Sequence, residues 1–139
     1  MTERRMRILV LLLGFAFMVG CMTMSDVIKS KQNGQSNVYS VNPDQAWEIA
    51  RTVFRWAKAD AIEEHRKEGY LVASTGANVM GAWIEAVDKK TTRVTAVSKR
   101  RIPINPLTDL SEKGFHDYFA QGVEIMKSGK RLPASPPKK

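Results

Sequence analysis

Residues 81–99 read GAWIEAVDKKTTRVTAVSK, and this stretch decides the fold. Two segments rich in β-branched and apolar residues, 81–88 and 92–99, flank the polar sequence Asp88-Lys89-Lys90-Thr91. Two such runs joined by a short polar connection predict a β-hairpin. Strands joined by a short turn pair in antiparallel fashion, so the sheet built around this hairpin is expected to be antiparallel.

The chain before the hairpin supplies further strands. Residues 70–75 and 60–66 are expected to be strands joined by a turn at residues 66–69, where Gly69 is free to adopt a positive φ. Residues 76–81 are expected to be a loop. Residues 37–41 alternate in polarity and predict a first strand. Neighbouring strands joined by short turns make a meander.

The first helix is predicted after this first strand. Asn42 can cap it, Pro43 suits its first position, and Gln45 stands where a capping box requires it. An apolar stripe recurs at helical spacing, and the helix is expected to end near Lys58. The residues of this stripe are Trp47, Ala50, Phe54 and Ala57.

A second helix is predicted near the end of the chain. It is expected to begin at Thr108 or Asp109, with acidic and polar residues in its first turn, and to end at Ser128-Gly129. Its apolar face consists of Phe115, Phe119, Gly122 and Met126. The element order β-α-β-β-β-β-α predicts an α+β fold, with an antiparallel four- to five-stranded sheet and two helices packed on one face. One domain over residues 37–128 is expected, followed by a disordered, basic and Pro-rich tail over 129–139.

The first 20 residues have the layout of a secretory signal. Arg4, Arg5 and Arg7 form a basic start, residues 8–19 are apolar, and Gly20-Cys21 ends the run. A basic start, an apolar core and a small residue before the break are typical of an exported protein. The apolar run is short for a transmembrane helix of about 20 residues. An uncleaved signal anchor that spans the membrane is the alternative.

Met18-Val19-Gly20-Cys21 resembles the lipobox of bacterial lipoproteins, with Met18 where Leu is usual. The resemblance implies that residues 1–20 are a signal peptide cut before Cys21. It also implies that the thiol of Cys21 receives a diacylglyceryl group and that its new amino group is acylated. Residues 21–36 would then be the lipidated cysteine and a flexible tether, spanning roughly 20 Å. Met22 is not Asp, the inner-membrane retention signal of similar lipoproteins, so an outer-membrane destination is expected.

The resemblance extends to small bacterial envelope lipoproteins of uncharacterised function. It is carried by the strand Val38-Tyr39-Ser40-Val41, the Trp-bearing helix and the Thr- and Val-rich hairpin at 91–97. It implies an envelope location and a compact α/β sandwich only, and the family lends no catalytic residues. The lipobox and the absence of clustered catalytic residues predict a non-enzymatic binding or interaction module that faces the periplasm. No cofactor is expected beyond the lipid on Cys21.

The formal charge of +8 favours an anionic neighbour. Removal of residues 1–20 takes away three Arg and one Glu and leaves +6. The export signal argues against nucleic acid and for anionic lipid or polysaccharide, with an envelope protein as the other candidate partner. Lys99, Arg100 and Arg101 are the candidate anionic contact.

A small hydrolase or metal-dependent enzyme is the alternative function. Glu63 and His65 share one face of a strand, and His116 is the other histidine. Two ligands at that spacing need a third from elsewhere, and zinc sites usually show three or four in clusters, so no metal site is expected. Ser111, His116 and Asp117 lie on one helix and do not converge into a triad, so no catalytic residue is assigned.

One face of the sheet is unusually apolar for a surface in water. If the alternate residues face the helices, the opposite face carries Tyr70, Val72, Trp83, Val87 and Val97. Exposed apolar patches of this kind often mark partner sites. The alternative is a register shifted by one residue, which would exchange the two faces.

Overall fold

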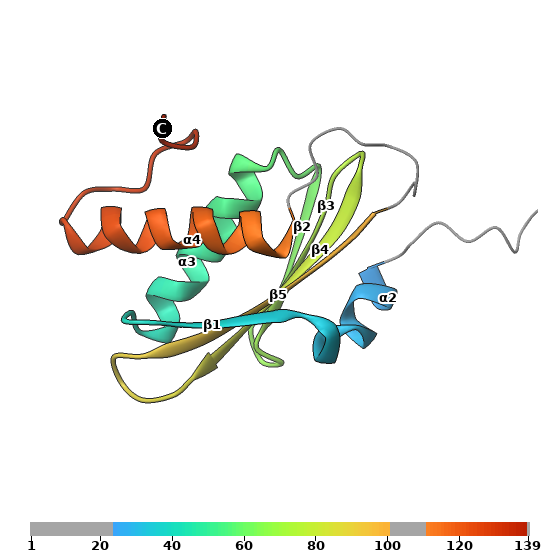
Figure 1. The fold of residues 1–139 in the computed structure, drawn as a ribbon, viewed down its shortest axis with the longest axis horizontal. Helices are drawn as coiled ribbons and strands as arrows, with labels where there is room; N and C mark the ends of the chain where they lie inside the picture. Colours follow the sequence, from blue (N-terminus) through green and yellow to red (C-terminus); the bar gives the residue numbers. More distant parts are fainter. Residues whose placement is uncertain (1–23, 101–110, 139) are drawn as a thin grey trace, which may run out of the picture.

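The computed structural model describes residues 24–100 and 111–138 (Figure 1). The signal segment, Cys21 and Arg101 therefore lie outside the described residues, as do Thr108 and Asp109. The elements are α2 (Met24–Lys29), η1 (Lys31–Asn33), β1 (Gln35–Tyr39), α3 (Pro43–Trp56), β2 (Ala61–His65), β3 (Tyr70–Ser74), β4 (Asn78–Ala86), β5 (Thr92–Arg100) and α4 (Glu112–Lys127).

The five strands form one antiparallel sheet in the order β1-β5-β4-β3-β2. The α+β fold class and the hairpin at 81–99, now β4 and β5, are confirmed. Gly69 has a φ of 79°, as the turn between β2 and β3 requires. The first strand lies two residues earlier than expected. β4 begins at Asn78, inside the segment expected to be a loop.

The extension of β4 has a local cause. The Asn78 side chain is buried, donates to Ser98 Oγ at 2.8 Å, and accepts from Thr75 Oγ1 at 2.7 Å. These hydrogen bonds satisfy a polar side chain that would otherwise be costly to bury. They also hold the start of β4 against the end of β5.

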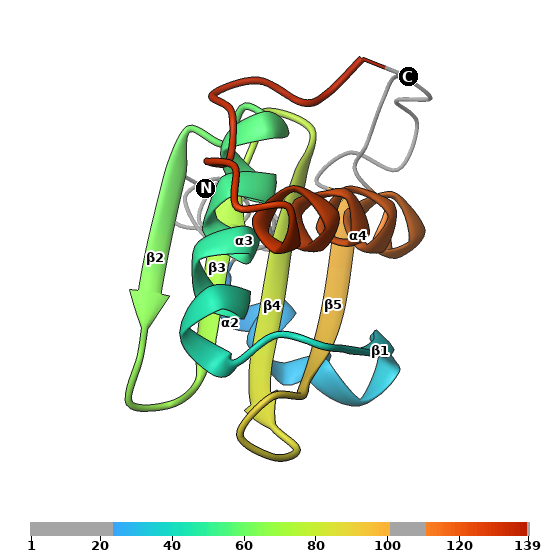
Figure 2. The ribbon, with the colours of Figure 1, turned by 90° about the vertical axis from the view of Figure 1, so that its left-hand side faces the viewer.

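The two helices α3 and α4 cover one face of the sheet (Figure 2). The capping box of α3 is present, with Asn42 accepting from the Gln45 backbone at 2.8 Å, and the helix ends at Trp56. Ser111 caps α4, so this helix begins a few residues later than predicted. The core between helices and sheet contains Phe54, Leu71, Val94 and Phe119, all fully buried.

The end of the chain is bound to the domain, and the prediction of a disordered tail from residue 129 is wrong for its first part. Trp56 Nε1 donates to the Pro133 carbonyl at 2.9 Å. Leu132 packs against the main core. A buried indole N–H needs an acceptor, and the chain after α4 supplies it.

A third helix lies on the other face of the sheet. Figure 2 shows α2 behind the strands and α3 and α4 in front of them. Val27 is fully buried, and residues 24–29 and 31–33 are helical. The prediction of a flexible tether up to residue 36 is therefore wrong for the described part of that segment.

Candidate functional site

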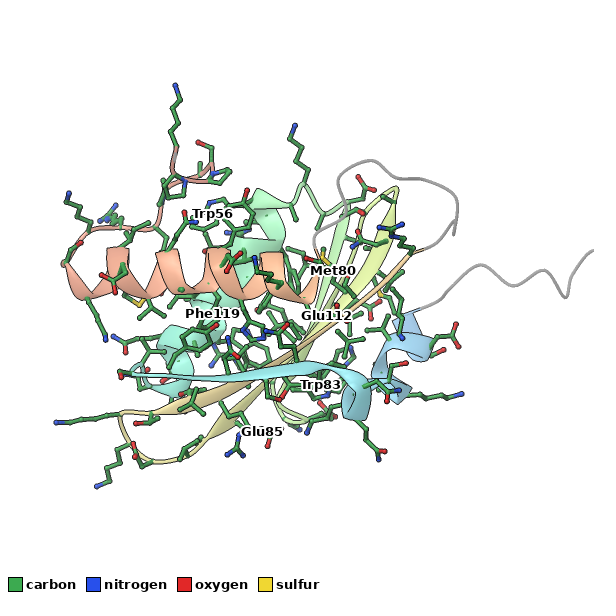
Figure 3. The ribbon with its side chains drawn as sticks, in the orientation of Figure 1. Trp56, Met80, Trp83, Glu85, Glu112 and Phe119 are labelled. Atoms are coloured by element: carbon green, nitrogen blue, oxygen red, sulfur yellow. The ribbon has the colours of Figure 1, made fainter. Side chains whose placement is uncertain are left out.

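The sheet face proposed from the sequence as a partner surface is occupied by the chain itself. Tyr70, Val72, Trp83 and Val97 do lie together on the face opposite α3 and α4. Val27 of α2 completes this outer cluster, and Trp83 is only 5% exposed. Figure 3 shows Trp83 on the side of the sheet away from α3 and α4. The alternative of a shifted register is wrong, because Leu71 and Val94 pack with α3 and α4 as the alternation predicts. The expectation of an open apolar surface is also wrong, because α2 covers this face.

Val87 is the exception among these residues. It follows the end of β4 and is 49% exposed. Val79, which the sequence did not single out, is fully buried in the outer cluster instead. The sequence does contain a signal for the covering helix α2. Met24, Val27 and Ile28 stand at the spacing of one apolar helix face.

The residues of the alternative enzyme site are not brought together. His65 lies on β2 and His116 is buried against β1, and these strands are the two opposite edges of the sheet. Glu63 Oε2 is 3.5 Å from His65 Nε2, and both side chains are exposed. Within residues 24–100 and 111–138 no group of three metal-ligating side chains occurs.

His116 belongs to a buried polar network that joins α4 to β1. Its Nε2 lies 2.7 Å from the Gln35 carbonyl oxygen, which can only accept, so Nε2 carries the proton. Its Nδ1 accepts from the Tyr39 hydroxyl at 2.6 Å. Burial lowers the pKa of His116 against the opposing effects of Gln35, Asp117 and Glu112, and burial raises the pKa of Tyr39. The arrangement holds a neutral imidazole and satisfies both of its nitrogens.

The lowered pKa of His116 predicts a loss of stability in mild acid. The unfolded chain binds a proton at His116 below about pH 6.5 while the folded chain does not, so the free energy of unfolding falls as the pH falls through this range. Urea unfolding at a series of pH values measures how the free energy of unfolding changes with pH. The slope should persist in His65→Asn, whose imidazole is exposed, and shrink in His116→Asn. An equal slope in both variants would contradict this role.

A second polar cluster lies where α3 meets β2. Glu64 Oε1 accepts from Trp47 Nε1 at 2.6 Å and from Arg51 Nε and Nη2 at 2.9 and 2.6 Å. The Arg66 guanidinium lies 4.8 Å from the centre of the Trp47 ring. Burial raises the pKa of Glu64, but the hydrogen bonds from Arg51 and Trp47 and the charges of Arg51 and Arg66 outweigh it and leave the pKa lowered. These contacts fix the edge strand to the helix layer.

A cavity of about 330 Å³ lies between α3 and the chain end. It is lined by Glu48, Arg51, Thr52, Arg55 and residues 132–134. None of Glu63, His65 and His116 lines it. Arg51 is already paired with Glu64, so the other charged side chains of the wall are the cation of Arg55 and the carboxylate of Glu48. The cavity therefore suits a small polar group better than an apolar one.

The candidate anionic contact is only partly within the described chain. Lys99 and Arg100 are the last two residues of β5. Lys99 is partly exposed and Arg100 is exposed, and Arg101 lies outside the described residues. Lys99 lies on the same face as Val97, because residues two apart along a strand share a face. It therefore lies on the side of the sheet that carries α2.

Comparison with protein-family models, with curated proteins and with solved structures found no match to this chain. The resemblance to envelope lipoproteins accordingly stays a prediction from the sequence. Among the residues that the structure describes, no helix is long and apolar enough to cross a membrane.

Proposed function

We propose that this chain is a non-enzymatic, lipid-anchored protein of the bacterial cell envelope, whose domain faces the periplasm and acts as a binding module. The observation that carries the proposal is the position of Cys21. It is the only cysteine, it ends a basic and then apolar segment, and it stands three residues before α2. A thiol placed there is well positioned to become the N-terminus of the mature protein.

The proposed lipid on Cys21 would anchor the protein to a membrane. Several acyl chains, at about 0.8 kcal/mol per buried CH₂, hold a protein on a bilayer essentially permanently. No membrane-spanning helix within the domain is needed for such an anchor. The absence of Asp at position 22 favours the outer membrane.

A binding role rather than an enzymatic one is supported by the buried polar side chains, which are engaged in contacts within the fold. His116 is hydrogen bonded at both nitrogens, and Glu64 is engaged by Trp47 and Arg51, so these side chains stabilise the fold. The positive charge of the chain, +6 once residues 1–20 are removed, favours an anionic envelope component or an acidic protein surface as the partner. Four of these charges lie in residues 129–139, whereas residues 37–128 carry a net charge of only +1.

The test is labelling with a fatty-acid probe in cells that produce the full-length chain. The wild-type protein should carry the probe and fractionate with the outer membrane. Cys21→Ser, which removes only the acceptor sulfur, should carry none. Equal labelling of the two proteins, or no labelling of either, would contradict the proposal.

A further inference from the structure

The segment between the proposed anchor and the domain is fixed to the sheet. Val27 lies against Val72, Val79, Trp83 and Val97, and all five are buried. Its contact with β4 is close, because a Cβ added at Gly81 would come within 2.9 Å of Val27 Cγ1. A side chain longer than that of glycine at this position would push against α2.

Polar contacts hold the next residues in place. Lys31 Nζ lies 2.6 Å from Glu85 Oε1 on β4, so an ion pair joins η1 to the outer face of the sheet. Gly34 passes close to β5, since a Cβ there would lie 2.7 Å from the Ala96 carbonyl oxygen. Residues 24–34 are thus part of the folded body rather than a free linker.

The distance from the anchor to this body is short. Cys21 and Met24 are three peptide steps apart, so their Cα atoms are separated by at most about 11 Å. A flexible tether of a dozen residues would have an end-to-end distance of roughly 20 Å and would leave the domain free to rotate relative to the membrane. With α2 docked, an acyl group on Cys21 would be attached within this distance of α2 and therefore near the face that α2 covers.

We propose that the α2-covered face is the membrane-facing surface of the protein and that its partner is the layer of phospholipid headgroups. The inference rests on the proposed lipid anchor. Lys29 on α2 and Lys99 at the end of β5 supply cations on this face for anionic headgroups. The helices α3 and α4, with the cavity at Arg51 and Arg55, then face the aqueous periplasm (Figure 2).

The experiment places one fluorophore on either face of the lipidated full-length product. Because Cys21 is used by the lipid, an introduced cysteine is the only free thiol. Glu63→Cys puts the probe on the α2 side of the sheet, opposite Val72, and Ala120→Cys puts it on the exposed side of α4. The proteins are reconstituted in vesicles of phosphatidylethanolamine and phosphatidylglycerol that carry a headgroup quencher.

We expect the probe at position 63 to lose most of its fluorescence and the probe at position 120 to keep most of it. The contrast should be smaller in phosphatidylcholine vesicles, and an equal contrast would overturn the role of anionic headgroups. Equal quenching at positions 63 and 120 would overturn the fixed orientation while leaving the anchor intact. Failure of the protein to enter vesicles at all would instead contradict the lipid anchor.

Val27→Asp tests whether docked α2 causes the orientation. It places a charge in the outer cluster and should release α2, so that the two probes become equally quenched while the protein stays on the vesicles. Asn33→Asp adds the same charge at an exposed position of η1 and should keep the contrast. Should Val27→Asp fail to fold, Val27→Ser removes the same buried apolar contacts without adding a charge, and it weakens the docking of α2. An unchanged contrast in a folded release variant would overturn the proposal.

Discussion

Replacing Trp83 by alanine is expected to destabilise the protein by about 3–5 kcal/mol, the usual cost of removing a buried large aromatic side chain. Trp83 is 5% exposed, and its ring lies 6.0 Å from that of Tyr70. Its loss also removes the surface on which Val27 and the rest of α2 rest. Since whole domains are stable by only about 5–15 kcal/mol, this is a large part of the total.

Val87→Ala is the matched control for Trp83→Ala. Val87 was expected on the same face, but it is 49% exposed, so its truncation should change the free energy of unfolding by less than about 0.5 kcal/mol. Urea unfolding of both variants measures the difference. A Trp83→Ala protein with wild-type stability would mean that α2 does not cover the face and would restore the open partner surface expected from the sequence.

Phe119→Ala is expected to cost a similar amount, about 3–5 kcal/mol, in the main core. Phe119 lies on the side of α4 that faces the sheet and is fully buried (Figure 3). The centre of its ring is 4.5 Å from that of Tyr39 and 5.8 Å from that of Phe115. The cavity left behind also removes support from Tyr39, whose hydroxyl bonds to His116. Both the helix layer and its attachment to β1 should weaken.

The control for Phe119→Ala is Val38→Ala. Val38 lies on β1 next to Tyr39, which contacts Phe119, but its side chain is 53% exposed. Its truncation should leave the unfolding midpoint nearly unchanged. If Phe119→Ala had an equally small effect, the packing of α4 on the sheet would not be as described.

Local sequence signals predicted the elements that local interactions define. The capping box at Asn42 and Gln45 and the hairpin flanking residues 88–91 depend on neighbours in sequence, and both are present. The alternation along β3 and β4 correctly separated the two faces of the sheet, because a strand has a period of two. The fold class followed from these elements.

What the sequence did not predict depends on distant partners. A six-residue helix such as α2 is too short to be stable alone and forms here because Val27 is buried on the sheet. The Tyr39–His116 pair and the Trp56–Pro133 hydrogen bond each join residues 77 positions apart. No spacing rule within one element reveals such contacts, so the local pattern alone predicts free chain for both the tether and the tail.

The central claim, a domain anchored through an acylated Cys21, is tested most directly by the intact mass of the protein purified from cell membranes. The account predicts a chain that begins at residue 21 and carries diacylglyceryl and N-acyl groups. A chain of full length beginning at Met1 with an unmodified thiol at Cys21 would contradict it.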